Sequence, residues 1–193
     1  MAKLDWLGDD GPLVLLADAE AAGWLGIWRN ARKGDPESEI ELVDGERMIM
    51  DVELDDDEPA TDYARACAAL DEEVAALVPF AGGTALALET TGHQAAFTCT
   101  GDSIVVAKWI FAPDEKHAAR VLASVPDELV WRDTEVVFVL RTKGVRLHPA
   151  ASRTETDVPT LPLALAPGRY AIDTTLFEPD EDSSFELFRL RAL

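Results

Sequence analysis

Cysteine and histidine are scarce in this chain of 193 residues, which contains two cysteines and three histidines. His93, His117 and His148 lie far apart in the sequence, and neither Cys67 nor Cys99 belongs to a Cys-x-x-Cys pair. Zinc sites usually depend on such close spacing, so we expect no metal site. Both cysteines sit among small apolar residues, which favours buried, unreactive thiols over a reactive or metal-binding role. A disulfide between them is allowed, but a chain of this size does not depend on one.

The sequence also lacks the motifs of nucleotide-binding folds and of common hydrolases. It contains no GxGxxG or GxxxxGK[ST] run and no GxSxG elbow. No apolar run is long enough to span a bilayer, and the acidic first ten residues do not resemble a secretory signal. We therefore expect a cytoplasmic protein, and the sequence assigns it no catalytic residue and no cofactor.

Basic residues are few, because seventeen Lys and Arg stand against thirty-seven Asp and Glu, for a formal charge of −20. Such a charge repels nucleic acid and anionic membranes and attracts basic partners. The simpler explanation is solubility, since acidic surfaces resist aggregation. The distribution of the acidic residues along the chain decides between these explanations.

The acidic residues are concentrated in residues 35–58, which hold twelve of them and one basic residue, Arg47, a local charge of −11. Apolar residues alternate with the acids on both sides of Asp44-Gly45, a dipeptide typical of tight hairpin turns. We expect an acidic hairpin insertion with one aliphatic face. The opposite face is expected to carry Glu39, Glu41, Asp51, Glu53 and Asp55.

The rest of the chain predicts an α+β fold, mainly antiparallel sheet with about two helices, in a single domain over residues 1–193. Helices are expected at residues 61–70, capped by Thr61 or Asp62, and at 114–125, capped by Asp114, with a short helix at 18–24. Trp24 and Trp28 have the spacing of one helical face, but Gly26 between them disfavours a continuous helix. Strands are expected at residues 12–16, 74–80, 84–89, 94–98, 104–111, 128–131, 135–141, 145–148, 169–176 and 185–193. The last two form a C-terminal β-hairpin at 169–193.

Like charges spaced along one strand face cost stability. A chain that retains this cost can use the charges for recognition, which gives the acidic hairpin two interpretations. It is either the solvated face of a half-buried ribbon or a surface complementary to a basic protein, such as the substrate groove of a nuclease. Trp6 lies beside turn residues and is the tryptophan most suited to exposure, although a core position is the safer expectation for each tryptophan. The residues predicted to bind a partner are Glu39, Glu41, Asp51, Glu53, Asp55, Asp56, Asp57, Glu58 and Trp6.

Other chemistry is less well supported by the sequence. If His93 and Cys99 meet across a strand pair, they allow a Cys–His nucleophile. A small enzyme that uses this pair, or a carboxylate site, is therefore an alternative. The run at residues 55–58 allows a weak divalent-ion site, but a solvated turn is the simpler interpretation because the EF-hand pattern is absent. An acidic regulatory or scaffold protein is a third possibility, which only the identity of a partner would separate from the first.

Two stretches of the sequence form a pattern of a known family. The first is Trp6-Leu7-Gly8, continuing through Gly11-Pro12-Leu13-Val14-Leu15-Leu16 to Trp24. The second is Asp62-Tyr63-Ala64-Arg65-Ala66-Cys67, followed by Val78-Pro79-Phe80-Ala81-Gly82-Gly83-Thr84-Ala85-Leu86-Ala87-Leu88. Together they resemble the polymorphic-toxin immunity protein family numbered twenty-one. Trp109 and the acidic helix start at Asp114 extend the resemblance over residues 4–125, with a weaker similarity at Pro167-Gly168-Arg169-Tyr170.

The resemblance implies an intracellular antidote that neutralises a cognate bacterial toxin by stoichiometric binding. Such a protein needs no cofactor, and the family supplies no catalytic residues to transfer. The sequence departs from the family pattern at Glu89-Thr90-Thr91-Gly92, where the family has Gly-Asp-Glu-Pro, and the acidic hairpin lies between the matching stretches. The partner expected from both lines of reasoning is a basic protein toxin.

Overall fold

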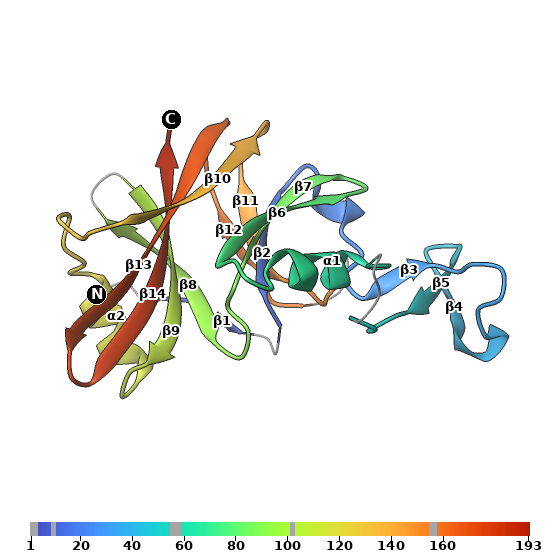
Figure 1. The fold of residues 1–193 in the computed structure, drawn as a ribbon, viewed down its shortest axis with the longest axis horizontal. Coiled ribbons are helices and arrows are strands. Elements are labelled where there is room, and N and C mark those ends of the chain that lie inside the picture. The colour runs from blue at the N-terminus through green and yellow to red at the C-terminus, as the bar shows by residue number, and fades with distance from the viewer. Residues whose placement is uncertain (1–3, 9–10, 55–58, 101–102, 155–157) are drawn as a thin grey trace.

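A computed structural model of the chain describes residues 4–8, 11–54, 59–100, 103–154 and 158–193. Its largest layer is an antiparallel sheet of six strands in the order β1-β8-β9-β14-β13-β10, here called the large sheet (Figure 1). These strands are β1 (Leu7–Gly8), β8 (Gln94–Thr100), β9 (Ser103–Phe111), β10 (Arg132–Leu140), β13 (Gly168–Asp180) and β14 (Ser183–Ala192).

A five-stranded antiparallel sheet, the second sheet, packs against the large sheet in the order β12-β11-β2-β7-β6. Its strands are β2 (Leu13–Ala17), β6 (Ala75–Phe80), β7 (Gly83–Leu88), β11 (Val145–Pro149) and β12 (Leu161–Leu163). β1 pairs with β8 and β2 pairs with β11, so the first two strands of the chain belong to different sheets. The expected α+β class with mainly antiparallel sheet and two helices is confirmed.

The apolar run of β2 is buried on both faces of the second sheet. Leu13 and Leu15 face the core between the two sheets, whereas Val14 and Leu16 face helix α1 (Asp62–Ala69). This division follows from the alternation of side chains along a strand. Each fully buried leucine contributes about 1.5–3 kcal/mol to folding, so the run anchors both layers.

Helix α2 (Glu115–Leu122) covers the outer face of the large sheet, packing Ala118, Val121 and Leu122 against strands β9 and β14. The layers therefore run α2, large sheet, second sheet, α1. Both helices start at predicted caps: the Thr61 hydroxyl accepts from the Ala64 amide at 3.1 Å, and the Asp114 carboxylate accepts from the His117 amide at 2.7 Å. Such caps satisfy amides that have no partner within the helix.

The expected helix at residues 18–24 is wrong. Only a short 3-10 turn, η1 (Ala21–Gly23), forms there. Trp24 turns into the core, where its Nε1 donates to the Ala150 carbonyl at 2.9 Å. The next residues are held by contacts distant in sequence, because the Leu25 amide donates to Asp62 and the Ile27 amide donates to the Ala151 carbonyl. Trp28 therefore starts a strand and shares no helical face with Trp24.

Two further strand predictions need correction. Residues 128–131 form no strand, and β10 begins at Arg132. The C-terminal hairpin is confirmed but is longer than expected, because β13 and β14 continue to Asp180 and Ser183, inside the expected loop. The Ser183 hydroxyl donates to the Asp180 carboxylate at 2.5 Å, which closes the turn.

A third, three-stranded antiparallel sheet, the small sheet, has the order β3-β5-β4. Its strands are β3 (Trp28–Asn30), β4 (Ile40–Val43) and β5 (Glu46–Met50), and the 3-10 turn η2 (Glu37–Glu39) precedes β4. Figure 1 shows the small sheet projecting beyond α1 at the end of the molecule opposite the β13–β14 hairpin. β4 and β5 thus form the predicted acidic hairpin. The third strand, β3, was not predicted from the sequence.

Candidate functional site

The turn of the acidic hairpin is the one its sequence predicts. Asp44 has φ 54° and Gly45 has φ 85°, and a two-residue turn with both φ values positive matches the right-handed twist of the flanking strands. This turn pairs Val43 with Glu46 and thereby fixes the register of the hairpin.

The register contradicts the predicted separation of aliphatic and acidic faces. Glu41 lies opposite Met48, and Leu42 lies opposite Arg47. Directly opposite residues of an antiparallel pair share a face, so apolar residues lie beside basic ones on one side and beside acidic ones on the other. One face carries Arg29, Ile40, Leu42, Arg47 and Ile49, and we call it the balanced face. The other, the acidic face, carries Trp28, Asn30, Glu41, Val43, Glu46, Met48 and Met50.

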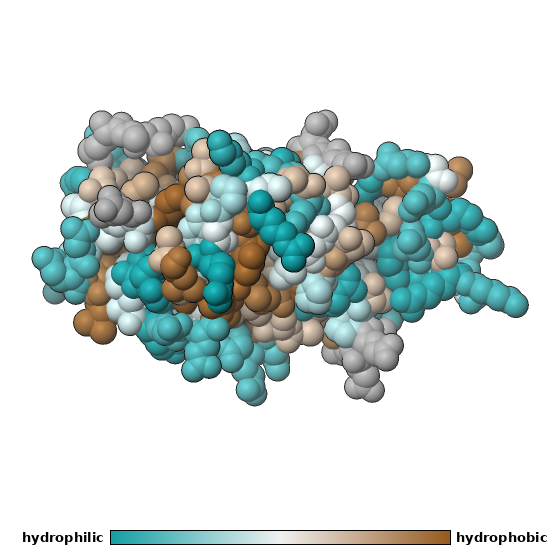
Figure 2. Space-filling view, turned by 90° about the horizontal axis from the view of Figure 1, so that it is seen from above, coloured by the Kyte–Doolittle hydropathy of each residue, from teal (hydrophilic) through white to brown (hydrophobic). Residues whose placement is uncertain are grey.

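Most side chains of the expected aliphatic face are exposed, which does not fit the interpretation of a half-buried ribbon. Met48 is buried, but β5 ends at Met50, which is 52% exposed. Leu42, Val52 and Leu54 are 76%, 60% and 51% exposed. Figure 2 shows the same end of the molecule as largely hydrophilic, with a few hydrophobic residues among the polar ones.

Arg29 neutralises two carboxylates at the base of the small sheet. Its Nε donates to Asp51 at 2.7 Å, and its two terminal nitrogens donate to Asp35 at 2.9 and 3.1 Å. These hydrogen bonds, together with the Arg32 amide, lower the pKa of Asp35 to about 2, and the bond from Arg29 lowers the pKa of Asp51. Asp51, predicted to bind a partner, is therefore engaged within the chain.

Two more acidic residues of the hairpin have internal partners. Arg47 contacts Glu37 at 2.7 Å, across the balanced face. Arg153, in the loop after β11, donates to the Asp44 carboxylate at 2.6 Å. The second contact ties the hairpin turn to the body of the protein, so the small sheet is held at its base by Arg29 and at its turn by Arg153.

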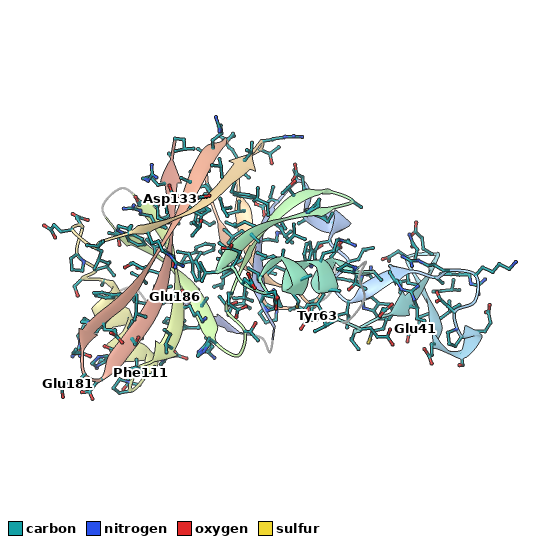
Figure 3. All side chains as sticks on the ribbon, in the orientation of Figure 1. Glu41, Tyr63, Phe111, Asp133, Glu181 and Glu186 are labelled. Carbon is teal, nitrogen blue, oxygen red and sulfur yellow. The ribbon has the colours of Figure 1, made fainter. Side chains whose placement is uncertain are left out.

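The remaining described carboxylates of this segment form no ion pair with any residue in the described ranges: Glu39, Glu41, Glu46 and Glu53. All four side chains are exposed. Figure 3 labels Glu41 on the small sheet, beyond Tyr63 of α1. Asp55, Asp56, Asp57 and Glu58, also predicted to bind a partner, lie outside the described residues.

A hollow of about 280 Å³ lies where the small sheet meets the body, lined among others by Leu25, Trp28, Arg32 and Arg65. Asp62 closes its floor, accepting from the Leu25 amide at 2.6 Å and from Arg65. Burial raises the pKa of Asp62, and the two hydrogen bonds only partly offset it. Among the described residues that line the hollow, Arg29, Asp62 and Arg65 are already paired, and the hollow joins the small sheet to α1.

Trp6 lies in a different part of the molecule from the acidic hairpin. It is half-buried on the outer face of the large sheet near α2, with its ring centroid 4.9 Å from that of Trp109. The small sheet lies beyond α1, on the other side of the sandwich (Figure 1). The structure therefore does not bring Trp6 together with the predicted acidic contacts.

The structure also keeps Cys99 and His93 apart. His93 precedes β8 and Cys99 lies near its other end, about 20 Å away at the usual rise of a strand. His93 Nδ1 lies 3.0 Å from the Trp109 carbonyl. Cys99 is exposed, contrary to the expectation of burial, because it lies at the end of the strand, whereas Ala95 on the same strand is buried in the core.

Cys67 is half-buried, and burial raises the pKa of its thiol. Within the described ranges, no three His, Cys, Asp or Glu side chains are grouped so as to hold a metal ion. The two described helices are too short and too polar to cross a membrane.

Sequence reasoning did not identify Arg29 and Arg153 as partners of the acidic segment. A signal existed for the first, because Arg29, Arg32 and Lys33 directly precede the segment. No local signal existed for Arg153, which lies 109 residues from Asp44. Comparison of the chain with protein-family models, with curated proteins and with solved structures finds no match. Its function is therefore inferred from the small sheet itself.

Proposed function

We propose that the chain binds a basic protein partner through the small sheet and neutralises it, as an immunity protein neutralises a toxin. The observation that carries the proposal is the mixture of exposed aliphatic and unpaired acidic side chains at residues 39–54. Met50, Val52 and Leu54 are all more than half exposed, among the free carboxylates of Glu39, Glu41 and Glu53. Exposed apolar groups rimmed by polar ones are characteristic of protein-binding surfaces.

The net charge of the chain indicates which kind of partner it favours. At −20 the protein attracts a basic surface over several ångströms of solvent, which raises the association rate and disfavours acidic partners. The exposed aliphatic side chains supply apolar area once contact is made, which slows dissociation. Salt should therefore weaken binding mainly through the association rate.

The ion pairs of the small sheet support the same proposal. Arg29 and Arg153 hold the hairpin in place before any partner arrives. A preformed surface loses less conformational freedom on binding than a flexible segment does. The like charges on β4 and β5 cost stability, and a role in recognition explains why the chain carries them.

The resemblance to immunity protein family twenty-one supports neutralisation of a toxin in the cytoplasm, by stoichiometric binding and without a cofactor. The enzyme alternative has no comparable support, since Cys99 and His93 lie at opposite ends of β8. A regulatory or scaffold role would use the same surface, and the identity of the partner distinguishes it from neutralisation.

Affinity capture tests the proposal. The chain is immobilised, exposed to a lysate of the source cells, and washed at low and then at high salt. The expected result is one basic protein bound at a ratio near one to one, released by salt, whose toxicity is relieved when both genes are expressed together. Recovery of only acidic proteins would contradict the proposed function. So would recovery of no protein from cells known to express the genes next to the gene of this chain.

A further inference from the structure

The two faces of the small sheet differ in charge balance. On the balanced face, Arg29 neutralises Asp35 and Asp51, and Arg47 contacts Glu37. Both arginines of the balanced face, Arg29 and Arg47, are therefore paired with carboxylates. A basic partner approaching it would meet two guanidinium groups and would have to displace existing ion pairs.

On the acidic face, Glu41 and Glu46 are exposed and form no ion pair with any residue in the described part of the chain, whereas the nearby Arg153 is paired with Asp44. Because Val43 pairs with Glu46 and Glu41 pairs with Met48, Glu41 and Glu46 are diagonal neighbours across the two strands. Such positions are separated by about 7 Å. Two cationic side chains at a similar spacing would each find a carboxylate.

Apolar area lies beside these carboxylates on the same face. Met50 is the other diagonal neighbour of Glu41, and its side chain is 52% exposed. Trp28, half-buried, lies directly opposite Met50 on β3. Methionine adapts its shape to a partner and also contacts aromatic rings well, so Met50 offers a deformable apolar contact next to Glu41.

Building on the proposed function, we infer that the basic partner docks on the acidic face alone. Its contact segment carries two cationic side chains about 7 Å apart, which bind Glu41 and Glu46, and an apolar side chain that packs on Met50. Leu42 lies on the balanced face of the same strand and stays outside the contact, despite its greater exposure.

Two substitutions at adjacent positions test the choice of face. Glu41→Gln and Leu42→Lys each change the net charge by one positive unit, on opposite faces of β4. The probe is the basic protein retained in the capture experiment, titrated against each variant by calorimetry at low salt. Glu41→Gln is expected to weaken binding at least about fivefold, as for a charge-assisted contact, and Leu42→Lys less than about twofold, as for remote surface charge.

Met50→Ala provides a second measurement, because it removes the apolar contact without changing charge. It should weaken binding at least about threefold while leaving the salt dependence unchanged. All three side chains are exposed, so each variant should unfold at the temperature of the unsubstituted protein.

The outcomes separate this inference from the proposed function. If Leu42→Lys weakens binding as much as Glu41→Gln, or if Glu41→Gln and Met50→Ala bind normally, the choice of face is wrong although the partner is real. If the unsubstituted chain retains no basic protein, the proposed function fails and the inference fails with it.

Discussion

The Nε of Arg29 donates to the carboxylate of Asp51 at 2.7 Å, which joins the middle of β3 to the residue that follows β5. The same guanidinium holds Asp35. Two of the twelve acidic residues of the segment are thereby neutralised by one arginine outside it. The acidic segment thus contains both structural and free carboxylates.

Replacement of Arg29 by Met removes both ion pairs and keeps most of the apolar stem. Asp35 and Asp51 then lie close together without a cation, and the midpoint of thermal unfolding should fall by about 3–6 °C at pH 7. Differential scanning calorimetry measures this midpoint. Arg47→Met is the matched control, since Arg47 is 57% exposed in its pair with Glu37, and it should change the midpoint by less than about 2 °C.

Stability should depend on pH through the same cluster. The pKa of Asp35 is lowered to about 2, so its contribution is complete above the ordinary carboxyl pKa near 4 and is lost as the pH falls through 2. The difference in unfolding midpoint between the unsubstituted chain and Arg29→Met should therefore shrink between pH 4 and pH 2. A difference that stays constant across this window would contradict the assignment.

The tether between Arg153 and Asp44 should restrain the hairpin turn. Asp44→Asn removes the ion pair, and because Asn also tolerates a positive φ the turn itself is retained. Backbone amides of residues 40–50 should then exchange with deuterium faster, while those of β13 and β14 keep their rates. Unchanged exchange in the hairpin would show that the tether does not order it.

Two glycines with positive φ should respond differently to alanine. A Cβ on Gly26 would lie 2.3 Å from the Ala151 carbonyl oxygen, whereas a Cβ on Gly45 meets nothing within 4 Å. Gly45→Ala should cost about 1 kcal/mol from the backbone alone. Gly26→Ala adds a clash with backbone and should destabilise the chain by several times that amount, measured by denaturant unfolding. Equal effects would contradict the close packing of residues 26 and 151.

The two thiols should differ in reactivity. Cys99 is exposed, so a thiol reagent at pH 7 should label it at the rate of an ordinary free cysteine. Cys67 is half-buried and its pKa is raised, so it should react much more slowly until the protein is unfolded. Labelling of single Cys-to-Ser variants distinguishes the two. A Cys99 that reacts far faster than a free thiol would revive the enzyme alternative.

Local patterns predicted the elements that local chemistry determines. The caps at Thr61 and Asp114 and the Asp44-Gly45 turn all occur as expected. The faces of the hairpin were wrong, although a two-residue turn pairs Val43 with Glu46 and so places Glu41 opposite Met48. The length of the turn therefore determines the register of the hairpin. The alternation of residue types alone gave the wrong composition of the two faces.

Contacts distant in sequence decided what local patterns could not. Residues 18–24 are Ala-rich enough for a helix, but the bonds of Trp24 and Leu25 to residues 150 and 62 favour an irregular path. Burial of Trp6 against Trp109 depends on the packing near α2, which its neighbours in the sequence do not indicate. The division of the acids into paired and free likewise depends on Arg29 and Arg153.

The most direct test of the account is a calorimetric titration of the captured basic protein into the unsubstituted chain, at about 50 mM and about 300 mM salt. The expected result is a one-to-one complex whose affinity falls at least about tenfold at the higher salt concentration. Binding that is unaffected by salt, or no binding at either concentration, would contradict the claim that the small sheet recognises a basic partner.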